Sequence, residues 1–213
     1  MKIFLLLLLI ITSTAAQDKL FDSKVDIDNP QKGFQKISKA LSETKALTAD
    51  FSQLKKIKVL KRPLKSSGKL TLANTLGVHW KLQKPYESTI IINSEKMTAI
   101  DDKGKKVTFT ADEKPIIYNF TRIFMSIFTG NTDELQEHFD LYFDGSKEEW
   151  RIGLIPKSSQ LRKVISKITL KGKGEQLRFL NIIEGNSDTT DITFSNMKRP
   201  QQLSEKDKKK FDF

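Results

Sequence analysis

The sequence of 213 residues contains no cysteine and only two histidines. The absence of cysteine excludes disulfide bonds, thiol catalysis and a lipid-modified cysteine. His79 and His138 lie far apart and lack the spacing of metal ligands, so we expect neither a metal site nor a catalytic role for them. Ser66-Ser67-Gly68 is not a nucleophile elbow, and Gly172-Lys173-Gly174 lacks the Lys-Ser/Thr of a phosphate loop. We therefore expect no catalytic residue, no cofactor and no metal: a protein that is not an enzyme.

Long apolar runs are also rare, and the one that stands out lies at the N-terminus. Met1-Lys2 provides a positive start, Ile3 to Ile11 are all apolar, and Thr12 to Ala16 are small. A run of this length is too short to cross a bilayer of ~30 Å as a helix. It predicts a cleaved signal peptide over residues 1–16, followed by one exported domain over residues 17–213 that is not tethered to a membrane. An uncleaved anchor is the alternative, and the small residues disfavour it.

Positive charge is in excess. Lys and Arg number 37 against 26 Asp and Glu, a formal net charge of +11 that falls to +10 when Lys2 leaves with the signal. Such an excess predicts anionic partners, either nucleic acid or lipid head groups. The lysines are spread along the chain, and no aromatic-basic motif of a nucleic-acid module is present. We therefore expect no nucleic-acid partner, and a solvated basic face for most lysines.

Two segments have helical periodicity. Phe34, Ile37 and Leu41 recur at helical spacing and predict an amphipathic helix over residues 31–43, with Asn29 as its cap and Pro30 in its first turn. The preceding residues 18–29 are polar, and we expect them to be mobile. From Pro115 to Gly130, apolar residues recur at spacings of three and four and predict a second helix with a wide apolar stripe.

The rest of the chain alternates with a period of two, which predicts β-strands. The expected strands cover residues 47–60, 68–72, 78–82, 89–92, 97–100, 105–110, 139–143, 150–154, 165–170, 177–183 and 188–197. Residues 158–162 read as a short polar connection. The predicted fold is mostly β with α: a strongly curved antiparallel sheet, a half-barrel of about 10–11 strands, covered by the two helices and enclosing an apolar cavity.

The candidate lining of this cavity consists of apolar and aromatic side chains, as in most ligand pockets. The candidates are Phe51, Leu70, Leu72, Trp80, Leu82, Ile91, Met97, Ile117, Phe120, Phe124, Ile127, Phe128, Trp150 and Ile152. Ordinary core packing is the alternative for each of them, since a single sequence leaves the direction of a strand residue open. His79 is expected on the face of its strand opposite to Trp80.

An ordered set of short motifs carries a family resemblance. The set comprises Ala49-Asp50-Phe51-Ser52-Gln53, Gly68-Lys69-Leu70, Trp80, Pro85, Glu87-Ser88, the strand from Trp150 to Lys157, and a closing Phe211-Asp212-Phe213. Together these residues resemble the outer-membrane lipoprotein carriers of the LolA type, over nearly all of the chain after the signal. The closing residues resemble the family's C-terminal strand.

The resemblance implies a half-barrel with a helical lid that binds acyl chains. It implies a monomeric carrier in the periplasm that takes lipoproteins from an inner-membrane exporter complex to an acceptor at the outer membrane. The missing cysteine suits the carrier, since the related acceptor is itself a lipoprotein. Whether the cargo is a lipoprotein or another lipid stays open. A lipid-sensing interaction protein of the same fold is the alternative, and a lipid hydrolase would need a nucleophile-base pair that the sequence does not offer.

One departure from the family concerns the lid. The family commonly has Arg-Pro in the strand after the glycine, where the arginine holds the lid shut. Asn74, followed by Thr75, stands at that position, and the Arg62-Pro63 pair lies before Gly68. Asn74 is therefore the candidate for locking the lid, by hydrogen bonds but without a fixed charge or a bidentate fork.

Overall fold

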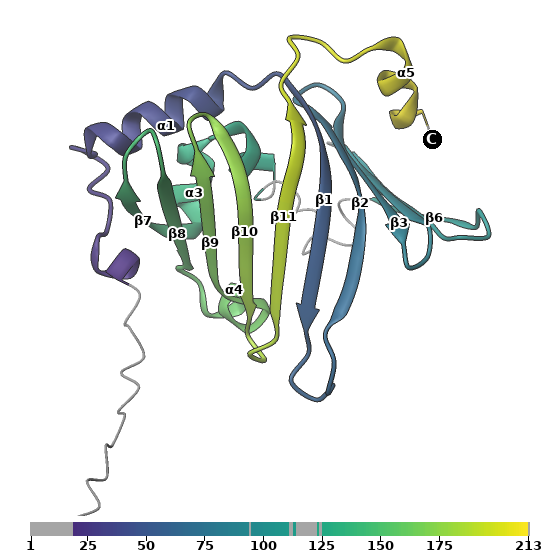
Figure 1. Ribbon diagram of the computed structural model, residues 1–213, viewed down its shortest axis with the longest axis horizontal. Helices are drawn as coiled ribbons and strands as arrows, with labels where there is room; N and C mark the ends of the chain where they lie inside the picture. Colours follow the sequence, from purple (N-terminus) through teal and green to yellow (C-terminus); the bar gives the residue numbers. More distant parts are fainter. Residues whose placement is uncertain (1–18, 94, 111–112, 114–122, 124, 213) are drawn as a thin grey trace, which may run out of the picture.

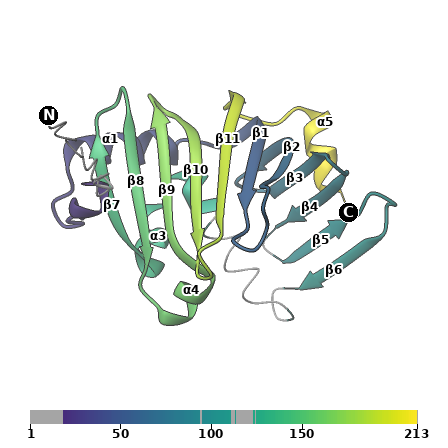
Figure 2. The ribbon, with the colours of Figure 1, turned by 60° about the horizontal axis from the view of Figure 1, so that its bottom comes forward.

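The computed structural model describes residues 19–93, 95–110, 113, 123 and 125–212. In this part of the chain the strands form one antiparallel sheet of 11 strands in the order β6-β5-β4-β3-β2-β1-β11-β10-β9-β8-β7. The strands are β1 (Ala46–Lys56), β2 (Leu64–Ala73), β3 (Gly77–Lys84), β4 (Ser88–Ile92), β5 (Lys96–Ile100), β6 (Lys106–Thr110), β7 (Phe139–Gly145), β8 (Trp150–Pro156), β9 (Ile165–Lys173), β10 (Gln176–Glu184) and β11 (Thr189–Lys198). The sheet is not closed, because β6 and β7 are its two edges, and strands β2–β6 fan out at an angle to β7–β11 (Figures 1 and 2). The predicted mostly-β fold with one large curved antiparallel sheet is confirmed.

The helices are short and gather mainly at one end and one face of the sheet. They are η1 (Lys19–Asp22), α1 (Lys32–Ser42), α3 (Thr132–His138), α4 (Ser159–Val164), α5 (Glu205–Lys208) and η2 (Lys209–Phe211), and residues 123 and 125–129 are also helical. Figure 1 shows α1 across the upper ends of β7–β9, α3 behind these strands, and α5 at the upper right, beyond the ends of β1–β3. No helix in the described ranges is both long and apolar enough to cross a membrane.

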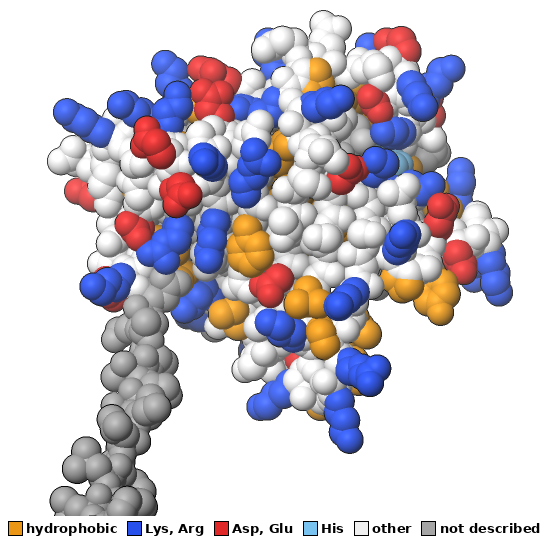
Figure 3. Space-filling view, viewed as in Figure 1, with side chains coloured by type: hydrophobic (Ala, Val, Ile, Leu, Met, Phe, Trp, Pro, Cys, Tyr) orange, Lys and Arg blue, Asp and Glu red, His pale blue; other side chains and the backbone are white. Residues whose placement is uncertain are grey.

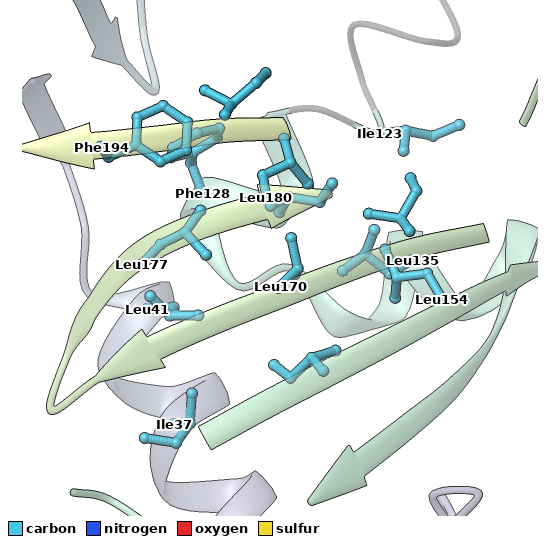
Figure 4. Packing of buried hydrophobic residues seen from close by; sticks show 14 of the residues in the cluster. Ile37, Leu41, Ile123, Phe128, Leu135, Leu154, Leu170, Leu177, Leu180 and Phe194 are labelled. Atoms are coloured by element: carbon cyan, nitrogen blue, oxygen red, sulfur yellow. The ribbon is translucent and has the colours of Figure 1, made fainter. Parts of the chain in front are cut away.

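One face of the sheet, here called the inner face, is apolar from β7 to β3. Its side chains come from alternate residues that the register places opposite one another, such as Phe143 and Ile152, or Leu180 and Ile192. The apolar side of α1 (Phe34, Ile37 and Leu41) packs against this face, together with Phe128 and Leu135 (Figure 4). Burial of this continuous surface is the main favourable term for the fold.

Several local expectations are wrong. The segment before α1 is ordered rather than mobile: Leu20 is fully buried, and the amide of Val25 donates to the carbonyl of Leu141, so this segment extends the pairing at β7. The cap of α1 is Gln31 and its first residue is Lys32, so Asn29 and Pro30 lie outside the helix.

Two short helices lie where the sequence predicted none. Residues 158–162 belong to α4, whose cap Ser158 accepts from the amide of Leu161. The segment before β7 forms α3, whose cap Asn131 accepts from the amide of Glu134. The closing residues were expected to form a strand, but Phe211 ends the short helix η2. Its side chain packs on the sheet, as described below. Ser, Asn and Asp at these positions favour helix starts over strands because their side chains satisfy free amides.

Candidate functional site

The inner face collects most of the predicted lining residues. Phe51, Leu70, Leu72, Ile127, Phe128, Trp150 and Ile152 are buried in one apolar cluster, and Trp80 and Leu82 are partly buried against it. Met97 lies beside this cluster on the same face, because it pairs with Ile92, which in turn pairs with the buried Val78. Ile117, Phe120 and Phe124 lie outside the described residues.

Aromatic contacts hold this cluster together. The rings of Phe51 and Trp80 stack with their centroids 3.9 Å apart. The ring of Phe128 meets that of Phe194 on β11 edge-on at 5.3 Å, which ties the helical segment 125–129 to the middle of the sheet. Offset and edge-to-face arrangements of this kind add to the burial energy.

In the part of the chain that the structure describes, a small hollow lies under the helices. An enclosed hollow of about 20 Å³ lies between α1, α3 and strands β7–β9, lined by ten residues that include Phe34, Ile127 and Leu170. A space of this size holds about one water molecule. The hollow is lined mainly by apolar side chains, and the described parts of the helices pack directly onto this part of the inner face.

The inner face is less covered at the β4–β6 end. Ile92, Met97 and Phe109 are half-buried there, and Ile90 and Val107 are 37% and 40% exposed. The apolar inner face therefore extends from the buried cluster onto β4, β5 and β6, where its side chains are partly exposed; this part is called the β4–β6 margin.

The helices contact each other closely. Gly130, which follows the helical segment 125–129, has φ +58°, and a Cβ at this position would lie 2.6 Å from the Cβ of Leu41 on α1. The hydroxyl of Ser38 donates to the carbonyl of Gly130 at 3.5 Å. Only glycine permits this approach, because it has no side chain and tolerates a positive φ.

Polar bonds fix the C-terminal end of α1 to the sheet. The side-chain amide of Asn74 donates to the carbonyl of Thr44 at 2.9 Å, and its backbone amide donates to Lys45 at 3.1 Å. The predicted locking residue thus binds the connection between α1 and β1.

Arg199, which sequence reasoning missed, makes a second and larger set of bonds at the same end. Its guanidinium donates to the carbonyl of Ala40 in α1, to the hydroxyl of Thr44 at 2.9 Å and to the carbonyl of Glu175 at 3.1 Å. Its side chain is 18% exposed. The signal that could have indicated it is the Arg199-Pro200 pair directly after the last strand. The proline ends the strand, and the guanidinium of the arginine can donate several hydrogen bonds at that point.

The opposite, outer face carries a smaller apolar cluster under the C-terminal segment. It consists of Ala46, Ala73, Ile91, Leu203 and Phe211, with Leu76 and Ile100 packed against it. The expectation that Ile91 lines the inner face is therefore wrong: it pairs with His79, and both point outward. The placement of His79 opposite to Trp80 is confirmed, since its ring lies 6.1 Å from that of Phe211.

His79 is held neutral in this position. Burial lowers the pKa of its imidazole, and the nearby positive charge of Lys210 lowers it further. Its Nδ1 is buried and has no hydrogen-bond partner. Lys210 is held by the hydroxyl of Thr71 at 3.2 Å and by the carboxylate of Asp207 at 2.6 Å, and its hydrogen bond lowers the pKa of Asp207. These contacts anchor the C-terminal segment against β2 and β3.

One group of possible metal ligands lies on α3, where none was predicted. The side chains of Glu134, Glu137 and His138 bring their ligand atoms within 4.8 Å of one another. The spacing became meaningful only once the segment proved helical, because residues four apart share a helix face. Exposed groups of this kind are common on helix surfaces, and the geometry alone assigns no ion.

Comparison with known proteins agrees with this architecture. The family model described as "Outer membrane lipoprotein carrier protein LolA" matches residues 42–213. An outer-membrane lipoprotein carrier protein from Dechloromonas aromatica (strain RCB) is 26% identical over 165 residues, which cover 76% of each chain.

Two solved structures align with most of this chain at low sequence identity. A LolA superfamily protein from Nitrosomonas europaea superposes with a TM-score of 0.45 at 7% identity, over 83% of this chain and 97% of the other. A putative outer membrane lipoprotein-sorting protein domain from Vibrio parahaemolyticus gives a TM-score of 0.44 at 10% identity, over 84% and 97%. The match of the family model over most of the chain is the decisive one: this protein belongs to the LolA family of outer membrane lipoprotein carriers.

Proposed function

We propose that this protein is a periplasmic carrier that binds the acyl chains of lipoproteins, or of a related lipid, on its inner face. In this proposal it receives its cargo from an inner-membrane exporter complex, crosses the periplasm as a monomer and delivers to an outer-membrane acceptor. The observation that carries the proposal is the continuous apolar inner face, covered by helices whose contacts with it are mainly side-chain packing. Nothing in this role requires a bond to be made or broken.

The energetics of burial support this role. Hiding each acyl CH₂ from water is worth ~0.8 kcal/mol, so a chain of about 15 methylenes gains on the order of 12 kcal/mol in an apolar site. In the structure, Phe34, Ile37 and Leu41 cover part of this surface. In this proposal, loading exchanges the apolar side chains of the helix for acyl chains as partners of the inner face, so that apolar surface stays covered.

The distribution of polar bonds suggests how the site opens. Arg199 and Asn74 hold the C-terminal end of α1 and the connection that follows it. The N-terminal half of α1 is held by packing, in which the ring of Phe34 meets that of Phe143 at 5.7 Å. We therefore expect α1 to swing about its fixed end, with cargo entering along the less covered β4–β6 margin.

The test is a transfer assay with a fluorescent triacylated lipopeptide, measured from donor vesicles to the protein. Leu82→Glu places a charge at the partly buried end of the inner face, whereas Gln83→Glu adds the same charge to the neighbouring exposed residue. Burying an unpaired charge costs several kcal/mol, so the first variant should lose at least about tenfold in lipopeptide affinity. The Gln83 variant should bind as the parent does.

Two outcomes would contradict the proposal. One is equal lipopeptide binding by the two variants while both remain folded. The other is a parent protein that takes up no lipopeptide and yields no lipid when native mass spectrometry is applied to protein isolated from the periplasm. If the isolated protein instead bound a specific protein partner and transferred no lipopeptide, the lipid-sensing alternative would be favoured.

A further inference from the structure

A basic hollow that opens on the outer face suggests a second binding site, distinct from the acyl site on the inner face. It has a volume of about 490 Å³ and lies over strands β7–β10. Its lining consists of Asp144, Gly145, Glu149, Trp150, Arg151, Lys171, Gly172, Lys173 and Arg178. We propose that it binds the phosphate of an anionic phospholipid head group and so holds the protein at a membrane surface.

The register explains how these residues come together. Asp144, Arg151, Lys171 and Phe179 pair in sequence across β7, β8, β9 and β10, so all four project from the same side of the sheet. This side is the outer one, because their neighbours Phe143, Ile152 and Leu170 belong to the buried inner cluster. Figure 3, which has the view of Figure 1, shows Lys and Arg side chains on this side of the molecule, interspersed with Asp and Glu side chains.

The charge in the hollow is not balanced from within. Four cationic side chains stand against two carboxylates. Arg151 is paired with Asp144. Lys173 and Arg178 are exposed, and neither forms an ion pair with any residue that the structure describes. A phosphate would supply the missing negative charge, and the guanidinium of Arg178 offers the planar donor fork that phosphate oxygens accept.

The surroundings favour a lipid head group over a soluble phosphate ester. The ammonium of Lys171 lies 5.4 Å from the centre of the Phe179 ring, and that of Lys167 lies 4.1 Å above the ring of Phe21. Phe21 in turn packs against Tyr142 at 5.3 Å. Cationic side chains interleaved with aromatic rings are typical of surfaces that lie at the head-group level of a membrane.

The experiment measures sedimentation with vesicles of phosphatidylglycerol mixed with phosphatidylcholine, and with vesicles of phosphatidylcholine alone. The test variant is the double substitution Lys173→Gln and Arg178→Gln. The matched control is Lys61→Gln and Arg62→Gln, which removes the same two charges from exposed residues between β1 and β2. Because each basic residue at an anionic surface contributes roughly a fivefold gain in binding, the test variant should lose about 25-fold on the anionic vesicles. The control should change binding by less than about threefold.

The outcomes are distinct. Equal losses in the two double variants would reduce the effect to net charge and overturn the proposal, as would equal binding to the two kinds of vesicle. Titration with glycerol 3-phosphate separates the sources: binding of this ester together with no vesicle binding would also overturn the head-group assignment. The proposal does not rest on acyl loading, because Leu82→Glu, which weakens lipopeptide binding, should change binding to anionic vesicles no more than Gln83→Glu, which adds the same charge.

Discussion

The contact between Gly130 and α1 allows a sharp test of the opening mechanism. Gly130→Ala introduces a Cβ 2.6 Å from the Cβ of Leu41 and 2.8 Å from the carbonyl oxygen of Ser38. Overpacking of this kind costs about 1–3 kcal/mol. The positive φ of +58° adds about 1–2 kcal/mol for a residue with a side chain. The variant should therefore be less stable by about 2–5 kcal/mol, and the part due to the clash falls on the contact between the two helices.

The consequence for binding follows from population shift. If acyl chains bind a form in which the helices have separated, destabilising the closed form raises the apparent affinity until the open form predominates. The assay is titration with an environment-sensitive fluorescent fatty acid, together with thermal unfolding. For Gly130→Ala we expect at least a tenfold gain in affinity and a lower Tm, since about 1.4 kcal/mol corresponds to a factor of ten.

A second glycine provides the control. Gly174 also has φ +58°, but nothing lies within 4 Å of the position of its Cβ. Gly174→Ala therefore carries the backbone strain without the clash, and should lower the Tm slightly while leaving fatty-acid affinity unchanged. The reasoning is refuted if Gly130→Ala lowers the Tm but binds the fatty acid no better than the Gly174 variant, since the helices would then not gate the inner face.

Three further predictions concern the anchored C-terminal segment. Arg199→Ala should lower the free energy of unfolding by about 2–3 kcal/mol, because the carbonyl of Ala40 and its neighbours lose their donor, whereas the exposed Arg62→Ala should change it by less than about 0.5 kcal/mol in denaturant titrations. The pKa of His79 lies below its ordinary value of 6.5, so its contribution to stability is present above pH 6.5 and is lost as the pH falls toward the lowered folded-state pKa. Urea titrations on either side of pH 6.5 should show that the free energy of unfolding falls less on acidification in His79→Gln than in the parent. An equal fall in the two proteins would contradict this role of His79. Phe211→Ser should expose the outer cluster and destabilise by about 2 kcal/mol while leaving fatty-acid affinity unchanged; altered affinity would show that the two faces are coupled.

The sheet was predictable because most of its strands bury one face only. In β7, for example, Phe139, Leu141 and Phe143 are buried and alternate with half-buried polar residues, which is the pattern that a period of two describes. The same reasoning placed Trp80 and His79 on opposite faces. Helix α1 was found because three apolar residues at helical spacing face the core.

The errors arise where the hydrophobic pattern does not show which face of the sheet a residue is on, or where contacts between residues far apart in the sequence determine the structure. Residues 89–92 are nearly all apolar, so alternation could not show that Ile91 faces outward. The reason for that run appeared only in the structure: the C-terminal segment covers the outer face at this point, so both sides of β4 meet apolar partners. Arg199 escaped notice because its acceptor, Ala40, lies 159 residues away in the sequence. The direction of the lid residues at 117, 120 and 124 stays a prediction.

The strand order has a consequence for how the chain reaches its final form. β1 pairs with β11 at the middle of the sheet, and the side chain of Asn196 donates to the carboxylate of Asp50 at 2.7 Å across 146 residues of sequence. The centre of the sheet therefore cannot form until nearly the whole chain has been synthesised, and closing so long a loop makes folding slow. Until then β1 has an unsatisfied edge, and a nascent chain in that state is easily kept unfolded by a partner that binds extended segments.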